Sequence, residues 1–176
     1  MRASPGADER ATYLPVAAYL GPMPTPDFIV RLRQKIGHDP LWLPGVTAVV
    51  LDGDEVLLVR RSDDGTWTPV TGIVDPGEHP EQTAVREVRE ETGTSCAVDA
   101  LVWVNVSEPI VHVNGDQAQY LDHTFRCRYL GGAARVADDE STDVGWFPVD
   151  DLPGMAPVFV ERIRRAVQHD GSRAQA

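Results

Sequence analysis

The chain has 176 residues, of which 42% are hydrophobic and 24% are charged, as in an ordinary globular protein with one substantial core. Its 27 acidic residues against 16 basic ones give a formal net charge of −11, which argues against nucleic acid polymers and anionic membranes as partners, since both need a basic surface. The sequence has no apolar run near the ~20 residues that cross a bilayer. The negative charge does not exclude a small phosphorylated ligand, because a bound divalent cation can invert the local charge.

The first part of the chain is expected to hold one short helix. Residues 1–24 are rich in Pro, Gly and Ala and predict a loosely ordered arm. Within 25–44, Thr25 suits a helix cap, Pro26 the first helical position and Gly37 the stop. Two roles stay open for this helix, covering the sheet edge or forming a homodimer contact, and its packing face is predicted to comprise Phe28, Leu32 and Ile36.

Strands are expected from residue 45 onward. Segments 45–51 and 55–61 are apolar and flank a turn rich in Asp and Gly, a pattern that predicts a β-hairpin. Further strand signals lie at 67–74, 96–106 and 143–149.

Two later segments have amphipathic patterns. Residues 117–130 alternate polar and apolar side chains and predict a half-buried strand, with Tyr120 on its polar face. Residues 156–169 predict a closing helix whose inward side chains are Val158, Ile163 and Val167.

Helices that interleave with hairpin-like strands favour one mixed α/β domain, in which helices cover a mixed β-sheet. We assign this domain to 45–170 and a polar tail to 171–176. Acidic residues stand near the N-terminus where a secretory signal would need apolar ones, and Cys96 and Cys127 suit reduced, buried thiols. A cytoplasmic location is therefore expected.

Residues 80–92 predict a helix with an unusual charge pattern. Pro80 suits its start and Gly93 its end. At ~100° per residue the apolar side chains and the glutamates form adjacent stripes, so the glutamates lie along the rim of the contact with the sheet. Neighbouring like charges destabilise a helix, and anions near its C-terminal end oppose the helix dipole. The glutamates concerned are Glu87, Glu90 and Glu91.

A divalent cation would explain this cluster. Partly desolvated carboxylates repel one another and persist mainly where a cation neutralises them, and hard oxygen ligands suit Mg²⁺, Mn²⁺ or Ca²⁺. The preceding loop adds Asp75 and Glu78, and Arg86 is placed to pair with a loop carboxylate such as Glu78. The competing interpretation is a solvated charged face without a ligand.

The segment resembles the Nudix box, G-x5-E-x7-R-E-U-x-E-E-x-G-U, where U is a bulky aliphatic residue. Eight of the nine specified positions match, from Gly72 through Glu78 and Arg86 to Gly93. Thr94 replaces the final aliphatic residue, a change that affects packing after the helix but no charged position. The resemblance implies a Nudix-like α/β/α sandwich with a mixed β-sheet, to which the N-terminal helix is an extension.

Nudix hydrolases cleave a diphosphate that links a nucleoside to another group, so the resemblance implies a Mg²⁺-dependent pyrophosphohydrolase, with Mn²⁺ as a substitute. The implied substrate is a small nucleotide, either an NDP-sugar such as ADP-ribose or a nucleoside triphosphate. Arg86 is implied as the residue that orients the catalytic carboxylates. The implied metal ligands are Glu87, Glu90, Glu91, the Gly72 carbonyl and Glu78.

The resemblance leaves the general base open. In some family members a helix glutamate serves, which here would be Glu87 or Glu90. In others the base comes from a later loop, and residues 137–142 offer Glu140, with Asp143 as the second choice.

Contacts to the nucleotide are expected from two arginines at the end of a strand and from two aromatic residues. Arg60 and Arg61 suit phosphates, and Trp67 and Tyr120 suit stacking on a base; the alternatives are a solvated strand end and core aromatics. Pro109 stands where the family associates a proline with ADP-ribose cleavage, whereas the motif that follows the box in NADH pyrophosphatases is not found.

Two other functions are weighed. A nucleotide sensor without turnover could keep the fold, but every charged box position is intact and no basic helix-turn-helix signal occurs. A diphosphate isomerase on the same fold relies on a catalytic cysteine, and Cys96 and Cys127 keep that alternative open.

Overall fold

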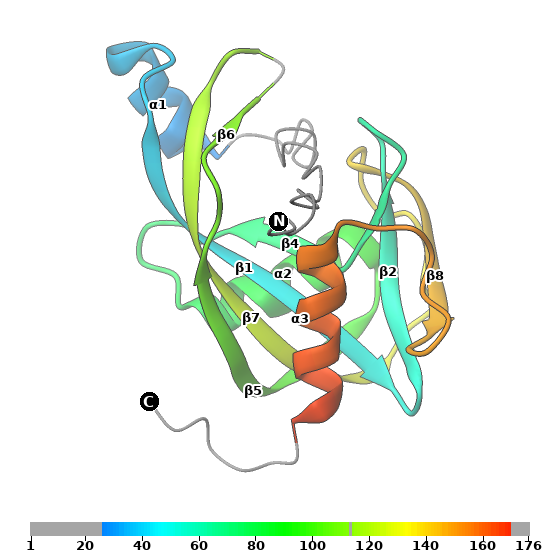
Figure 1. The fold of residues 1–176 in the computed structure, drawn as a ribbon. Helices are drawn as coiled ribbons and strands as arrows, with labels where there is room; N and C mark the ends of the chain where they lie inside the picture. Colours follow the sequence, from blue (N-terminus) through cyan, green and yellow to red (C-terminus); the bar gives the residue numbers. More distant parts are fainter. Residues whose placement is uncertain (1–25, 113, 170–176) are drawn as a thin grey trace, which may run out of the picture.

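A computed structural model describes residues 26–112 and 114–169 (Figure 1). The predicted arm at 1–24, the cap at Thr25 and the tail at 171–176 lie outside the described residues. In chain order the elements are α1 (Asp27–Ile36), β1 (Leu41–Asp52), β2 (Glu55–Arg61), β3 (Trp67–Thr68), β4 (Val70–Ile73), α2 (Pro80–Thr92), β5 (Ser95–Val106), β6 (Ile110–Val111), β7 (Gln117–Gly131), β8 (Ser141–Pro148) and α3 (Pro157–Gln168).

The strands form one mixed sheet. Its main path runs β3-β2-β1-β7-β5, with β4 paired to β1, β6 to β7 and β8 to β2. β1 and β7 are parallel, and the other pairs are antiparallel, including the predicted hairpin of β1 and β2. The mixed sheet predicted from the interleaved pattern is thus confirmed.

Alternate residues of β1 show how two helices cover the two faces. Ala48 packs in one apolar cluster with Val88 of α2, whereas Val49 packs in another with Ile163 of α3. Successive side chains of a strand point to opposite faces, so α2 and α3 lie on opposite sides of the sheet (Figure 1). This is the predicted α/β/α sandwich. None of the helices in the described residues is long and apolar enough to span a membrane.

α1 lies apart from these layers, beside the hairpin of β6 and β7 (Figure 1). It begins at Asp27, one residue after the predicted start, and Gly37 ends it with a φ of 61°, as expected. The predicted packing face was wrong in part: Ile29 is 4% exposed while Leu32 is 38% exposed. The apolar contact of α1 is made by Ile29 and the partly buried Phe28, which join a cluster at the end of the sheet.

β1 and β7 also differ from prediction. β1 starts at Leu41, not at residue 45, because its first residues pair in parallel with the start of β7. β7 is not half-buried: Tyr120, Asp122 and Thr124, on the face predicted to be polar, are all buried. β7 is a central strand between β1 and β5 and has both faces covered. Polar side chains on such a strand therefore do not indicate a face that is exposed to solvent.

α3 turns a different set of side chains inward from the one predicted. Ile163 is 1% exposed, as expected, but Val167 is 40% exposed. The other buried residues of α3 are Phe159, Arg162 and Ala166. The burial of Arg162 could not be predicted, because a pattern of apolar residues does not indicate that a charged side chain faces inward.

Candidate active site

α2 presents the acidic residues, and it forms for local reasons. Pro80 occupies the first helical turn, and the His79 N–H donates to the Gln82 side chain at 3.3 Å. Gly93 ends the helix in the left-handed conformation, with φ 68°. The predicted bounds, 80–92, are confirmed.

The three glutamates near the end of α2 differ in burial. Glu91 is 5% exposed, and the side chain of Glu87 is 14% exposed while that of Glu90 is 57% exposed. Glu87 and Glu91 therefore lie along the rim of the helix–sheet contact, as predicted, whereas Glu90 reaches into solvent, which the apolar and acidic stripes did not predict.

Arg86 donates hydrogen bonds to three of the surrounding carboxylates. Its guanidinium donates two hydrogen bonds of 3.0 Å to Glu78, which confirms the predicted pair. The same guanidinium donates to Glu87 at 3.0 Å and to Glu90 at 2.9 Å. Thr83 holds Glu78 by a further hydrogen bond of 2.7 Å, and the hydrogen bonds from Arg86 lower the pKa of Glu78. The bidentate contact fixes the plane of Arg86.

Gly72 of β4 lies directly against Glu87. A Cβ added at Gly72 would stand 2.4 Å from the Cγ and Oε1 atoms of Glu87. Only glycine therefore lets the Glu87 carboxylate lie against the backbone of β4.

The segment before β8 brings further acids to α2. The Ala137 N–H donates to the Glu91 carbonyl at 3.1 Å, and the Ser62 N–H donates to the Glu140 carbonyl at 2.8 Å. A cleft of about 530 Å³ opens between this segment and α2. The acidic residues that line it are Asp75, Glu87, Glu90, Asp138 and Glu140. Asp138 was not predicted, because an acidic loop gives no signal that separates a site residue from a solvated one.

Burial and mutual repulsion make these carboxylates hard to ionise. Burial, with neighbouring acids, raises the pKa of Glu87 to about 7 and that of Glu140 to about 7. Burial raises the pKa of Glu91 well above its ordinary value, and Glu87, Glu140 and Asp138 add to the effect. The positive charge of Arg61 lowers the pKa of Glu91 and of Glu140 and so offsets part of this rise.

The donor set fits a hard divalent cation. Carboxylate oxygens that repel one another in a partly buried cleft are the ligands that Mg²⁺ and Mn²⁺ prefer. In the conformation described, Arg86 bonds to two of them, and no group of three or more His, Cys, Asp or Glu side chains within 26–112 and 114–169 is arranged as ligands to one ion. A cation bound by Glu87 and Glu90 would therefore take the place of their hydrogen bonds to Arg86.

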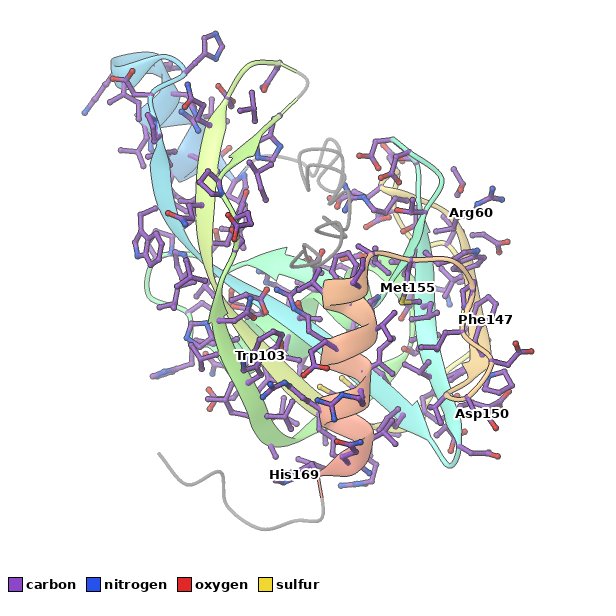
Figure 2. The ribbon with its side chains drawn as sticks, viewed as in Figure 1. Arg60, Trp103, Phe147, Asp150, Met155 and His169 are labelled. Carbon is purple, nitrogen blue, oxygen red and sulfur yellow. The ribbon has the colours of Figure 1, made fainter. Side chains whose placement is uncertain are left out.

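The predicted substrate residues on β2 and β3 lie in different surroundings. Arg61 is 9% exposed and forms an ion pair with Asp63. Its charge lowers the pKa of Glu140 in the cleft. Arg60 is exposed and donates to the Gly65 carbonyl at 3.0 Å, on the β2 side of the molecule (Figure 2). Trp67 packs edge-to-face on Phe147, with ring centroids 4.7 Å apart, in the apolar layer under α3.

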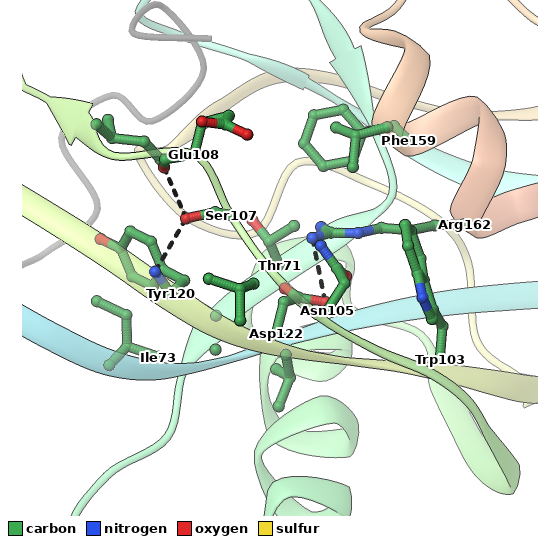
Figure 3. A pocket seen from close by; sticks show the side chains of 16 residues that line it. Thr71, Ile73, Trp103, Asn105, Ser107, Glu108, Tyr120, Asp122, Phe159 and Arg162 are labelled. Atoms are coloured by element: carbon green, nitrogen blue, oxygen red, sulfur yellow. Dashed lines mark hydrogen bonds and ion pairs between the residues drawn. The ribbon is translucent and has the colours of Figure 1, made fainter.

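Tyr120 lines a separate apolar pocket of about 320 Å³ on the α3 face of the sheet (Figure 3). The pocket meets the cleft at β4, since Gly72 and Ile73 line the pocket and Ile73 also lines the cleft. Its other lining residues include Trp103 and three polar residues that the sequence did not predict for the site, namely Asn105, Asp122 and Arg162.

The residues of the alternative predictions lie away from the cleft. Cys96 and Cys127 are buried in the apolar cluster under α2. Asp143 is exposed on β8, next to Arg60 across the strand pair. Pro109 is exposed between β5 and β6.

Comparison with known proteins identifies the class that this fold and site define. Residues 41–169 match the family model of the NUDIX domain. A MutT-like protein of Streptomyces ambofaciens is 34% identical over 147 residues, covering 81% of this chain and 88% of that protein. The chain belongs to the Nudix family, and its enzyme class is that of the Nudix pyrophosphohydrolases.

Other relatives differ in length and named activity. The NAD-capped RNA hydrolase NudC of Stutzerimonas stutzeri is 32% identical over 122 residues, which cover 68% of this chain but 41% of NudC. Among solved structures, a UDP-X diphosphatase has a TM-score of 0.59 at 23% identity, covering 80% of this chain and 68% of its own. An ADP-ribose pyrophosphatase of Streptococcus suis has a TM-score of 0.55 at 23% identity, covering 76% and 94%. These two structures show a shared fold.

Proposed function

We propose that this protein is a divalent-cation-dependent hydrolase that cleaves the diphosphate linkage of a small nucleoside diphosphate derivative. The observation that carries the proposal is the position of the acidic cleft directly across β4 from an apolar pocket. A substrate with a charged diphosphate and an apolar, planar end matches the two compartments.

The cleft residues have separable roles in this mechanism. Glu87, Glu90 and Glu91, with the Gly72 carbonyl, would hold Mg²⁺ or Mn²⁺, and Glu78 keeps Arg86 in place. A bound cation would neutralise the diphosphate and lower the pKa of a coordinated water. Arg86 lines the cleft and would donate to a substrate phosphate if its hydrogen bonds to Glu87 and Glu90 were released.

Glu140 is the general base that the geometry favours. It lines the cleft, forms none of the ion pairs found within the described residues, and is held by backbone hydrogen bonds rather than by its carboxylate. Its carboxylate is therefore available to accept a proton from the attacking water. Glu87 and Glu90 bond to Arg86 instead.

A small nucleotide is the proposed substrate rather than an RNA. The net charge of −11 disfavours a polyanion, and the chain spans about two fifths of the length of the NudC relative whose name refers to RNA. The ADP-ribose pyrophosphatase and UDP-X diphosphatase names suggest which NDP-linked compounds to try first.

The test is product analysis with Mg²⁺ present. ADP-ribose cleaved at the diphosphate gives AMP and ribose phosphate, whereas a nucleoside triphosphate gives a monophosphate and pyrophosphate. Labelled water must enter a phosphate product, which an isomerase would not allow. Binding without any turnover would instead support the sensor alternative.

Variants of the cleft assign the roles. Glu90→Gln and Glu140→Gln should stay folded and lose about 10²-fold or more in kcat, since each removes a charge or a base from the reacting centre. Glu81→Gln, on the exposed first turn of α2, serves as the matched control. Wild-type kcat in either cleft variant would refute the role given to that residue.

A further inference from the structure

The apolar pocket contains two buried polar groups that the proposed chemistry does not use. Its walls include Ile73, Ile110 and Val158, and its aromatic members include Trp103 and Tyr120. Asn105 of β5 and Arg162 of α3 both line it (Figure 3).

Arg162 is rigidly placed although it is almost fully buried. Its side chain is 7% exposed, it donates to the Thr47 hydroxyl at 2.6 Å, and its second terminal nitrogen lies 3.3 Å from Asp122. Asp122 is itself fixed by hydrogen bonds of 3.1 and 3.2 Å from Thr47 and Thr124. The guanidinium therefore cannot turn to satisfy its buried Nε–H, which has no partner among the described residues.

One donor and one acceptor in the pocket lack partners. Among the described residues, neither the buried Arg162 Nε nor the buried Asn105 Oδ1 has a hydrogen-bond partner. Leaving buried polar groups unpaired is unfavourable. A ligand that presents an acceptor to Arg162 and a donor to Asn105 would satisfy both groups.

The charge of the pocket indicates which part of the substrate it takes. Asp122 neutralises Arg162, so a phosphate would gain no net cation here, and the acids of the cleft lie across β4. A sugar would leave most of its hydroxyls against apolar walls. A nucleobase has flat apolar faces and an edge with an acceptor next to a donor.

On this basis we infer that Asn105 and Arg162 select the base of the nucleotide substrate, with Asp122 as the positioning residue for Arg162. The inference rests on the proposed function for the identity of the substrate, but not for the binding of the base. A nucleoside carries no phosphate, so its binding does not depend on the cleft.

The first experiment measures binding of adenosine, cytidine, guanosine and uridine to the full chain by calorimetry with chelator present. One or two of these nucleosides should bind, and Asn105→Leu should weaken that binding about tenfold or more, because one hydrogen bond to a buried group is lost. Val104→Leu, at an exposed neighbouring position on β5, is the matched control and should bind the nucleoside as the wild type does.

The second experiment compares kcat/KM for ADP-, CDP-, GDP- and UDP-glucose, which differ only in the base. The preference of the wild type should be reduced in Asn105→Leu and in Arg162→Lys, which keeps the charge but loses the Nε donor. Thermal unfolding separates recognition from structure: Asn105→Leu removes an unpaired oxygen and should leave Tm unchanged or raised, whereas a structural role would lower it.

The outcomes distinguish the two proposals. Nucleoside binding that depends on Asn105, without turnover of any NDP-glucose or of ADP-ribose, would leave this inference standing and remove the hydrolase assignment. Turnover with the same base preference in Asn105→Leu as in the wild type, or no detectable nucleoside binding, would overturn the inference.

Discussion

Glu91 is an acidic residue that is almost fully buried between α2 and the segment before β8. Burial raises its pKa, and Arg61 offsets the effect in part. We expect Glu91→Gln to raise the free energy of unfolding of the metal-free protein by about 0.5–2 kcal/mol, the usual range for stabilising substitutions, because it removes a desolvated charge. Urea unfolding in chelator measures this. A loss of stability in Glu91→Gln would show that the carboxylate makes a favourable contact in the metal-free fold.

The close contact between Gly72 and Glu87 can also be tested by substitution. Gly72→Ala places a methyl group 2.4 Å from Glu87 atoms, so the carboxylate must move. We expect kcat to fall about 10²-fold, the effect of misplacing a catalytic group by about 1 Å, with little change in Tm. Gly154→Ala is the control, since a Cβ there meets nothing within 4 Å. Unchanged kinetics in Gly72→Ala would mean that Glu87 need not lie against β4.

At the scale of elements, α3 offers a direct test of its corrected packing face. Ile163→Ala should lower the free energy of unfolding by about 2–5 kcal/mol, because it leaves a cavity under α3. Val167→Ala, at a position 40% exposed, should change it by no more than about 0.5 kcal/mol. Denaturant titrations of the two variants give the comparison. Similar losses of unfolding free energy in both would mean that Val167 packs inward, as the apolar pattern predicted.

The helices differ in how far their sequences determine them. α2 was predicted to the residue because its signals are local: Pro80 at the start, Gly93 at the end and an apolar stripe between. The inward face of α3 and the burial of β7 depend on what covers them, and Arg162 and Asp122 are buried as a pair. No local pattern distinguishes such a pair from two solvated charges.

The candidate site divides in the same way. Spacing within one helix indicated the acidic half, and the resemblance supplied its roles. The pocket joins side chains from β5, β7 and α3, and only the folded chain brings Asn105 and Arg162 together. For the same reason Trp67, an aromatic residue next to the box, gave no sign that it packs on Phe147.

For the whole molecule, the cation should act as a stabilising ligand. Mg²⁺ at 100 times its Kd should raise the free energy of unfolding by about 2.7 kcal/mol, and chelator should reverse the gain. Sodium chloride at equal ionic strength controls for general screening of the net charge of −11. The gain should vanish in Glu91→Gln; an undiminished gain there would place the ion elsewhere.

β4 separates the acidic cleft from the apolar pocket. Gly72 and Ile73 pair with Val46 and Gly45 of β1, and adjacent residues of a strand are separated by ~3.3 Å and face opposite ways. If the base and the diphosphate bind as proposed, the strand fixes the distance between the ring and the bond that is broken. A longer phosphate chain would be cut at the same distance from its ring, and a residue inserted ahead of Gly72 would shift the cut or abolish it.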